Sequence, residues 1–363
     1  MKILIDISNI KSEYEGVAVY ALNILKGFKD NKYTNILILA HPQIYKFIKD
    51  TFPEYTCIKA IIPQTGKHLF FKEGLSWSKQ INNIECDIIF SPVPHFTHLF
   101  CKQKIIQTIH DLQPLALYKG KDLILYKLLL PLLLLRSHKL ITISNFIKNN
   151  ILQNYSFIKS QKIQTIYNSV ITYDYKEEKA PVSYKYLLYI SNLWEYKNVF
   201  TLVKAFNIIK EQTDYRLVII GRNTPYWENT VYPFITKHNL KDKIIQINSV
   251  LSNDEIVQFY KHASLFIHPS LMEGFGYPPI EAAIYEIPVL TTKETCLYET
   301  TQGLLNYYSP AKDEVELAKK IMMILQNPPT SESLKSISEK LKQEYNYKEQ
   351  AKKIYQFIIS QTK

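Results

Sequence analysis

The chain has 363 residues, which suits two domains of about 150–180 residues each better than one hydrophobic core. Hydrophobic residues make up 46% and charged residues 21%, which excludes an intrinsically disordered protein. The formal charge of +11 favours anionic phosphates or an anionic membrane surface as partners. Nucleic acid is not expected, because the chain lacks zinc-finger spacing and a single-strand stacking motif.

Cysteine usage and the first residues bear on the compartment. Cys57, Cys86, Cys101 and Cys296 have neither metal-ligand nor redox spacing, which indicates reduced thiols. Asp6 interrupts the first apolar run, so a secretory signal is not expected. These features favour a cytoplasmic protein.

The most apolar stretch of the sequence is Leu123–Leu135. Lys127 and Pro131 interrupt it, and it is shorter than the roughly 20 apolar residues that a membrane-spanning helix needs. Together with the basic composition, it favours peripheral docking on the inner face of a membrane. The alternative is a helix that packs entirely on the protein core.

Short apolar runs alternate with helical stretches along the whole chain. Strands of the first half are predicted at Ile3–Ile5, Ile36–Leu39, Asp87–Phe90, Ile105–Ile109, Leu140–Ile143 and Ile163–Ile166. Strands of the second half are predicted at Tyr186–Ile190, Leu217–Ile220, Ile244–Ile247, Leu265–Ile267 and Val289–Thr291. Runs that are apolar on both faces and separated by helices are typical of parallel sheets covered on both sides. The fold class is therefore α/β, with two Rossmann-like, doubly wound domains.

Helix signals and a polar segment support this division. Apolar residues between Val199 and Ile209 follow the 3.6-residue period of a helix. Ser252 and Glu255 have the spacing of a capping box at a helix start. The segment Ser169–Ser183 is polar and contains proline, which makes it the predicted linker.

The strongest motif is Pro269-Ser270-Leu271-Met272-Glu273-Gly274-Phe275-Gly276-Tyr277-Pro278-Pro279-Ile280-Glu281-Ala282. It lies between a predicted strand and a predicted helix. Glycine permits close approach of the backbone to a ligand, and proline suits the first helical turn. The N-terminus of such a helix attracts phosphate, and two carboxylates could accept hydrogen bonds from sugar hydroxyls. The alternatives are an ordinary tight loop and a surface position for Glu281.

This motif resembles the Glu-x7-Glu signature of the family-4 glycosyltransferases, which adopt the two-domain GT-B fold. The resemblance implies that Glu273 contacts hydroxyls of the transferred sugar and that Glu281 contacts the nucleotide ribose. It also implies that the backbone of Gly274, Phe275 and Gly276 holds the diphosphate.

Further positions in the second half extend the resemblance. Lys197, within Ser191–Asn198, matches a lysine that contacts the donor phosphate. Asn192 stands where many members have a phosphate-binding arginine, and Arg222 is a candidate replacement cation. Leu251 matches a position whose backbone meets the nucleotide base.

In the first half, His110 and the following aspartate close a strand, a pattern that in this family places the histidine over the donor sugar. Gly16 is the remaining glycine of a loop that is usually richer in glycine. His95 and His98 are either acceptor contacts or plain loop histidines. The resemblance implies an acceptor-side domain at 1–170, a donor-binding domain at 171–345 and a final helix, 346–363, that crosses back.

By resemblance, we expect a retaining hexosyltransferase that works in a cleft between the domains, with GDP-mannose as the favoured donor. The expected acceptor is a saccharide or lipid-linked saccharide of bacterial surface-polysaccharide synthesis. No Asp-x-Asp triplet occurs, so no metal cofactor is expected. Two hypotheses stay open: a nucleotide-sugar 2-epimerase of the same fold, and a non-catalytic nucleotide-sugar-binding subunit.

Overall fold

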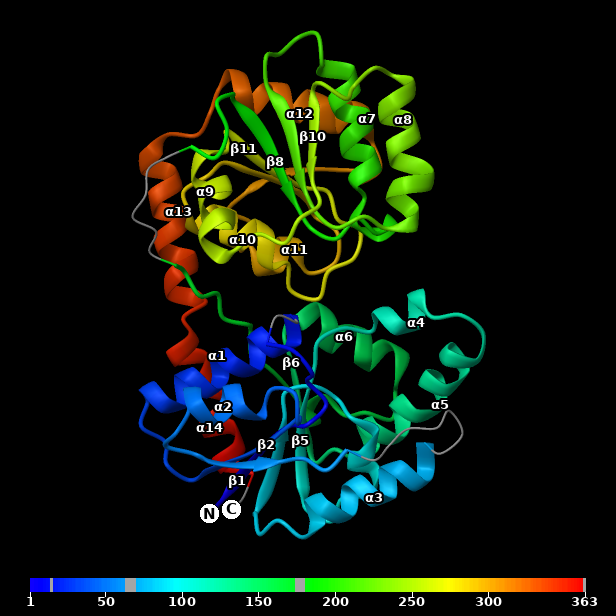
Figure 1. The fold of residues 1–363 in the computed structure, drawn as a ribbon, viewed down its shortest axis with the longest axis vertical. Coiled ribbons are helices and arrows are strands. Elements are labelled where there is room, and N and C mark those ends of the chain that lie inside the picture. The colour runs from blue at the N-terminus through cyan, green and yellow to red at the C-terminus, as the bar shows by residue number, and fades with distance from the viewer. Residues whose placement is uncertain (14–15, 63–69, 174–179, 362–363) are drawn as a thin grey trace. The chain divides into compact units, whose positions relative to one another are not determined.

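The computed structural model describes residues 1–13, 16–62, 70–173 and 180–361. The chain divides into two units, unit 1 with residues 1–169 and 345–363, and unit 2 with residues 170–344. Each unit has one sheet with helices packed around it (Figure 1). The predicted pair of doubly wound sheets is therefore present. The central part of the predicted linker, 174–179, lies outside the described residues.

Unit 1 is built on a sheet with the order β3-β2-β1-β4-β5-β6-β7, in which all neighbours are parallel. Its strands are β1 (Ile3–Ile7), β2 (Ile36–Ala40), β3 (Thr56–Lys59), β4 (Ile88–Ser91), β5 (Lys104–Ile109), β6 (Lys139–Thr142) and β7 (Ile163–Thr165). The central strands are buried on both faces, as their continuous apolar sequence predicts.

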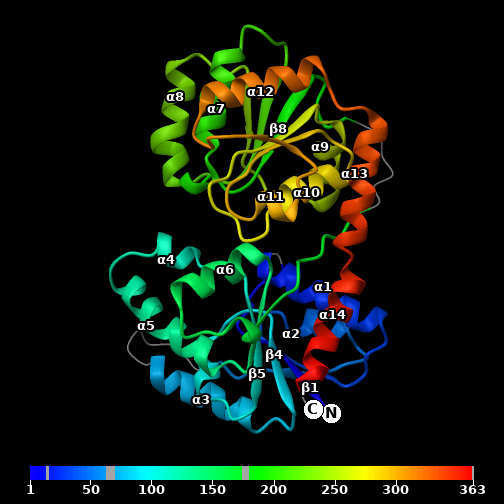
Figure 2. The same cartoon turned by 180° about the vertical axis from the view of Figure 1, so that it is seen from behind.

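The helices of unit 1 cover its sheet. They are α1 (Gly16–Asp30), α2 (Tyr45–Thr51), α3 (Phe70–Asn82), α4 (Gln113–Leu117), α5 (Gly120–Arg136), α6 (Asn145–Asn154) and α14 (Tyr347–Ser360), with 3-10 turns η1 (Phe96–Phe100) and η2 (Ser160–Lys162). Figure 2 shows α14 beside α1, on the side of the unit away from α5. Among the described residues, no helix is both long and apolar enough to cross a bilayer.

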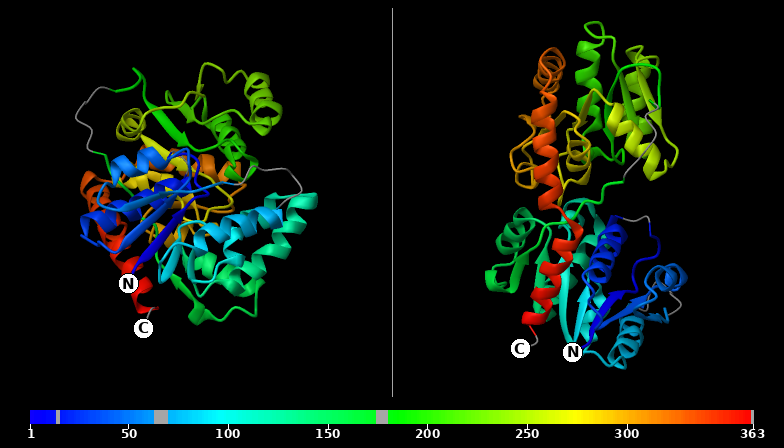
Figure 3. Two further views of the ribbon diagram at one scale, coloured as in Figure 1. Left: turned by 60° about the horizontal axis from the view of Figure 1, so that its bottom comes forward. Right: turned by 90° about the vertical axis from the view of Figure 1, so that its left-hand side faces the viewer.

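Helix α14 belongs to unit 1 although it follows unit 2 in sequence (Figure 3). A Cβ placed on Gly27 of α1 would lie 2.8 Å from the carbonyl oxygen of Tyr347 and also too close to Ala351. Glycine therefore permits the close contact between α1 and α14. Gln350 donates to the carbonyl of Tyr167 at 2.9 Å and ties α14 to the end of the sheet.

Unit 2 has a sheet with the order β10-β9-β8-β11-β12-β13, again parallel throughout. Its strands are β8 (Tyr186–Ile190), β9 (Arg216–Ile220), β10 (Ile244–Ile247), β11 (Leu265–His268), β12 (Val289–Thr292) and β13 (Asn306–Tyr308). The core joins this sheet to α7 (Val199–Ile209) and α12 (Glu314–Gln326).

The other helices of unit 2 are α8 (Tyr232–Lys237), α9 (Asn253–His262), α10 (Tyr277–Ile284), α11 (Leu297–Thr300) and α13 (Ser331–Glu344), with a short 3-10 helix η3 (Glu195–Lys197) and a short π-helix η4 (Trp227–Val231). Ser252 and Glu255 form the predicted capping box of α9, with both reciprocal hydrogen bonds present. The helix predicted at Val199–Ile209 has those bounds as α7.

The sequence analysis did not predict β3 and β13, and each of them is one of the two edge strands of its sheet. β3 has half-buried or exposed residues throughout, and β13 has only three residues. An edge strand is covered on fewer sides, so its sequence need not be a continuous apolar run. Sequence patterns therefore find the interiors of both sheets and miss one edge of each.

Candidate functional site

The predicted donor-binding residues of unit 2 lie where the strand order reverses. β8 pairs with β9 on one side and with β11 on the other. Helices leave the carboxyl ends of these strands toward opposite faces, which opens a crevice where α/β proteins bind ligands. Lys197 follows β8, and Glu273 follows β11. The two side chains therefore flank this switch point.

The loop between β11 and α10 has a backbone that requires glycine. Gly276 is the N-cap of α10 and has a φ of 83°, in the left-handed region. A Cβ there would also lie 2.5 Å from Leu297. Pro278 and Pro279 occupy the first turn of α10, where a missing N–H is tolerated. These residues fix the first turn of α10 directly after Gly276, so the positive end of the helix dipole lies at the loop.

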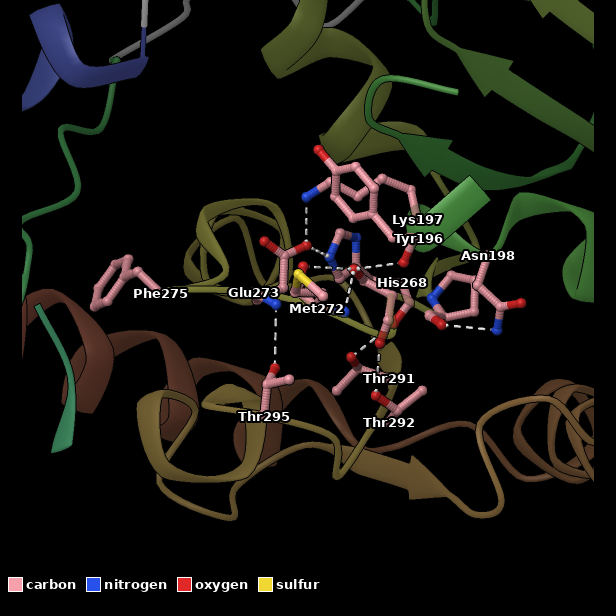
Figure 4. Close-up of polar contacts among 12 residues, drawn as sticks. Tyr196, Lys197, Asn198, His268, Met272, Glu273, Phe275, Thr291, Thr292 and Thr295 are labelled. Atoms are coloured by element: carbon pink, nitrogen blue, oxygen red, sulfur yellow. Dashed lines mark hydrogen bonds and ion pairs between the residues drawn. The ribbon is translucent and has the colours of Figure 1, made fainter. Parts of the chain in front are cut away.

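Glu273 forms the centre of a buried polar cluster (Figure 4). The Nζ of Lys197 and the Nε2 of His268 both lie 2.7 Å from its Oε1. Both contacts use Oε1, and Oε2 accepts no hydrogen bond within the part of the chain that the structure describes. One oxygen is thus held by the protein, and the other can accept from a ligand.

The charge state of Glu273 follows from these contacts. Burial acts to raise its pKa, but the charge of Lys197 and the hydrogen bonds from His268 and Lys197 outweigh burial and lower the pKa to about 2. The carboxyl group is therefore ionised at neutral pH. An ionised, fixed carboxylate is a strong acceptor for hydroxyl donors.

His268 was not among the residues that the sequence identified. It ends β11, its side chain is fully buried, and its Nε2–H donates to Glu273. Its Nδ1 has no hydrogen-bond partner among the described residues. The signal available in the sequence was a polar residue at the end of an apolar strand, directly before Pro269 and the motif.

The backbone around Glu273 is fixed by its neighbours. Its N–H donates to the hydroxyl of Thr295 at 3.2 Å, and its carbonyl accepts from the thiol of Cys296 at 3.3 Å. The loops of Lys197 and Glu273 are joined by a hydrogen bond from the N–H of Leu271 to the carbonyl of Tyr196, at 2.9 Å. These contacts fix the backbone that carries Glu273 and link it to the loop that carries Lys197.

Glu281 lies on α10 and is half-buried rather than on the open surface. The hydroxyl of Tyr260, on α9, donates to its Oε2 at 3.0 Å. Burial raises the pKa of Glu281, and this hydrogen bond offsets the rise in part. The predicted second carboxylate thus has a defined position on the helix that begins at Gly276.

The remaining predicted donor contacts of unit 2 lie on exposed loops. Asn192 and Arg222 are exposed, and Leu251 is half-buried before α9. The hydroxyl of Thr224 donates to the carbonyl of Leu193 at 2.6 Å, which joins the loops after β8 and β9. The structure therefore brings the loops of Asn192 and Arg222 together, while neither side chain joins the Glu273 cluster.

His110 in unit 1 follows β5 and is half-buried. Its Nε2–H donates to the carbonyl oxygen of Pro92 at 2.7 Å, and its ring packs edge-on against Tyr20 at 4.8 Å. Burial lowers the pKa of His110, although the bond to Pro92 and the charge of Asp111 oppose the shift. The ring is held in one orientation by these contacts.

The other candidates of unit 1 have different positions. Gly16 is the first residue of α1, and a Cβ there would meet no described atom within 4 Å, so the structure shows no steric need for glycine. His98 is fully buried, with its Nε2 2.7 Å from Asp6 and its Nδ1 3.1 Å from Gln107. Burial lowers the pKa of His95 to about 4. His98 is thus a core histidine that links three elements.

Family models cover nearly all of the chain. Residues 14–173 match the model described as Glycosyltransferase Family 4, and residues 172–344 match the model described as Glycosyl transferases group 1. The chain therefore belongs to the family-4 glycosyltransferases. Within the described residues, no group of three or more His, Cys, Asp or Glu side chains has the arrangement of a metal site.

Curated relatives point in the same direction. O-antigen chain mannosyltransferase RfbU of Salmonella typhimurium is 30% identical over 61% of this chain and 61% of its own length. O-antigen chain mannosyltransferase B of Escherichia coli is 26% identical over 54% of this chain and 55% of its own length. The match thus spans less than two thirds of either mannosyltransferase. Uncharacterized glycosyltransferase MJ1178 of Methanocaldococcus jannaschii is 25% identical over 88% of this chain and 87% of its own length.

Solved structures confirm the fold class. Sucrose-phosphate synthase from Thermosynechococcus elongatus has a TM-score of 0.75 at 16% identity, over 99% of both chains. HepE of Anabaena, in complex with UDP and glucose, has a TM-score of 0.76 at 15% identity, over 99% of this chain and 100% of its own. The predicted α/β GT-B architecture with two Rossmann-like domains is correct.

Proposed function

We propose that the chain is a retaining hexosyltransferase that moves mannose from GDP-mannose to a hydroxyl of a saccharide or lipid-linked saccharide in bacterial surface-polysaccharide synthesis. The observation that supports this most directly is the cluster at Glu273. A buried, ionised carboxylate with one unused oxygen is suited to hydroxyls of a sugar. Lys197 in η3 pairs with Glu273, and the N-terminus of α10 and Glu281 follow Glu273 in the chain. In this proposal these groups together bind the nucleotide sugar.

In this proposal, the acceptor hydroxyl attacks the anomeric carbon on the face from which the nucleoside diphosphate leaves. The bond from that carbon to the diphosphate oxygen breaks, and the leaving phosphate takes the hydroxyl proton. Lys197 and the N-terminus of α10 stabilise the negative charge that develops on the diphosphate. Glu273 holds the sugar through Oε2, and His110 orients the reacting centre.

The choice of donor rests on similarity to the two O-antigen mannosyltransferases. HepE, with the same fold, was solved with UDP and glucose, which makes uridine nucleotides the necessary comparison. Thermal stabilisation by GDP-mannose, GDP, UDP-glucose and UDP should identify the nucleotide, because a ligand that binds the folded state raises its melting temperature. Stabilisation by uridine nucleotides alone would contradict the mannose assignment and leave glycosyl transfer intact.

Activity is tested by incubating the donor with and without a saccharide acceptor and following release of the nucleoside diphosphate. Glu273→Gln should lower turnover by about 10²–10³-fold, because it removes charge from a fixed acceptor. Glu332→Gln, at an exposed position of α13, is the matched control and should leave turnover unchanged. Release of an epimerised sugar would support the 2-epimerase instead, and binding without turnover would support a non-catalytic subunit.

A further inference from the structure

Helix α5 carries an apolar stripe on its exposed face. The stripe consists of Ile124, Leu125, Leu128, Leu132 and Leu135. The exposed fractions of Ile124 and Leu128 are 60% and 63%, and those of Leu132 and Leu135 are 51% and 53%. Steps of three and four residues place these side chains on one face.

The opposite face of α5 is apolar as well, and it is buried. Leu129, Leu130, Leu133 and Leu134 pack against unit 1. A helix that is apolar on all sides is normally buried on all sides. The sequence left two interpretations of the leucine run open, packing on the core and docking on a membrane, and the buried face fits the first of them. Packing on the core accounts for the buried leucines and leaves the stripe without a role.

Positive charge lies at both ends of the stripe. Lys119 and Lys121 are exposed at the start of α5. At its other end, burial and the charges of Lys104, Lys139 and Lys162 lower the pKa of His138. Burial and the charges of Arg136 and Lys139 lower the pKa of Lys162 in turn. The Nζ of Lys162 donates to the carbonyl oxygen of Leu135 at 2.8 Å, which places this cationic group at the end of the stripe. Asp122, in the first turn of α5, is the acidic residue of this helix.

We propose that α5 docks unit 1 on an anionic phospholipid bilayer. The apolar stripe enters the boundary between head groups and acyl chains, and the cationic groups at its ends contact lipid phosphates. This arrangement needs no membrane-spanning helix, and it does not depend on the proposed glycosyl transfer.

Charge favours a bilayer over a second copy of the chain. In a symmetric pair, the α5 helices would run parallel or antiparallel, and both arrangements place cationic ends against cationic ends. Like charges at a contact oppose association. A stable interface also needs about 800 Å² from each partner, more than the five side chains of one narrow stripe provide. An anionic bilayer can bury the apolar stripe and also attract the cationic groups at its ends.

Co-sedimentation with vesicles tests the proposal. Vesicles of equal parts phosphatidylcholine and phosphatidylglycerol should bind the protein at about 0.05 M salt and release most of it at about 0.5 M, because salt screens the attraction. Vesicles of phosphatidylcholine alone should bind little. Absence of the protein from the anionic pellet at low salt would overturn the proposal.

A pair of matched variants assigns the binding to α5. Leu128→Glu with Leu132→Glu should weaken binding to anionic vesicles at least about tenfold, because burying one leucine is worth more than that factor. Val315→Glu with Met323→Glu on α12, also at exposed apolar positions, should bind like the unchanged protein. Equal binding by the stripe variant would overturn the proposal. So would a dimer, measured by light scattering, that the stripe variant dissociates.

The charges are tested separately. Lys104→Gln with Lys139→Gln should weaken binding to anionic vesicles and reduce its salt dependence. The melting temperature should stay close to that of the unchanged protein, because Lys104 is exposed, Lys139 is half-buried, and the glutamine amides can still donate a hydrogen bond. Unchanged salt dependence would show that these lysines do not face lipid and would refute the proposed orientation.

Discussion

Replacing Lys197 with methionine should destabilise unit 2. The variant keeps most of the side-chain volume but removes the ammonium group that lies 2.7 Å from Glu273. The carboxylate then stays buried with His268 as its partner. Removing one partner of a buried ion pair costs about 3–5 kcal/mol, because the remaining charge is neither solvated by water nor neutralised by the lost ammonium group.

The pKa of Glu273 gives a second measure of the same interaction. It is lowered from 4.5 to about 2 despite burial, which corresponds to about 3 kcal/mol in favour of the charged form. A carboxyl with a lowered pKa stabilises the folded state above its unfolded pKa, and this contribution is lost as pH falls toward the folded value. The unchanged protein should therefore lose about 3 kcal/mol of stability from this group between about pH 5 and pH 2. Glu273→Gln should lack this loss.

The assay is urea unfolding followed by hydrogen exchange in peptides from α7 and β11, which reports on unit 2 separately from unit 1. Lys197→Met, Glu273→Gln and the double variant complete a thermodynamic cycle. The double variant should be more stable than Lys197→Met by about 1–3 kcal/mol, because the neutral amide no longer needs a cation. Additive single effects in this cycle would refute the coupling between these two side chains.

Three further predictions concern other parts of the chain. His110→Ala should lower turnover by about 10²–10³-fold and leave nucleotide binding by calorimetry nearly unchanged; lost binding with normal turnover at saturation would contradict its assignment. EDTA should leave transfer unaffected, whereas abolition by EDTA with rescue by Mg²⁺ or Mn²⁺ would show a metal requirement. Gly27→Ala should lower the stability of unit 1 by about 1–3 kcal/mol in urea unfolding, because the new methyl group overlaps Ala351; unchanged stability would mean that α14 shifts freely.

Sequence patterns predict the interior of this fold well. Central strands such as β8 and β11 are buried on both faces, and apart from His268 at the end of β11 their residues are apolar. The edge strands β3 and β13 have no such requirement, and patterns did not find them. Helix α5 shows a different limit. Leucines occupy both its buried and its exposed face, so the sequence alone does not show which of them are buried.

The sequence identifies candidate residues of the site, but it does not show which of their side chains contact one another. The motif identifies Glu273, and the segment after β8 identifies Lys197, but their ion pair joins positions 76 residues apart. That pairing depends on β8 and β11 being neighbours in the sheet. His268 was missed for a similar reason. Its role depends on the contact with Glu273, and that contact forms only when the loop after β11 brings Glu273 back to the end of the strand.

The position of α14 determines when each unit can complete its fold during synthesis. Unit 2 is one continuous segment, whereas unit 1 takes its last helix from beyond residue 344. A ribosome therefore releases all of unit 2 before it releases α14. Until then the surface of α1 around Gly27 lacks the helix that packs against it. The second half of this chain can thus finish folding before the first half, the reverse of the usual order for consecutive domains.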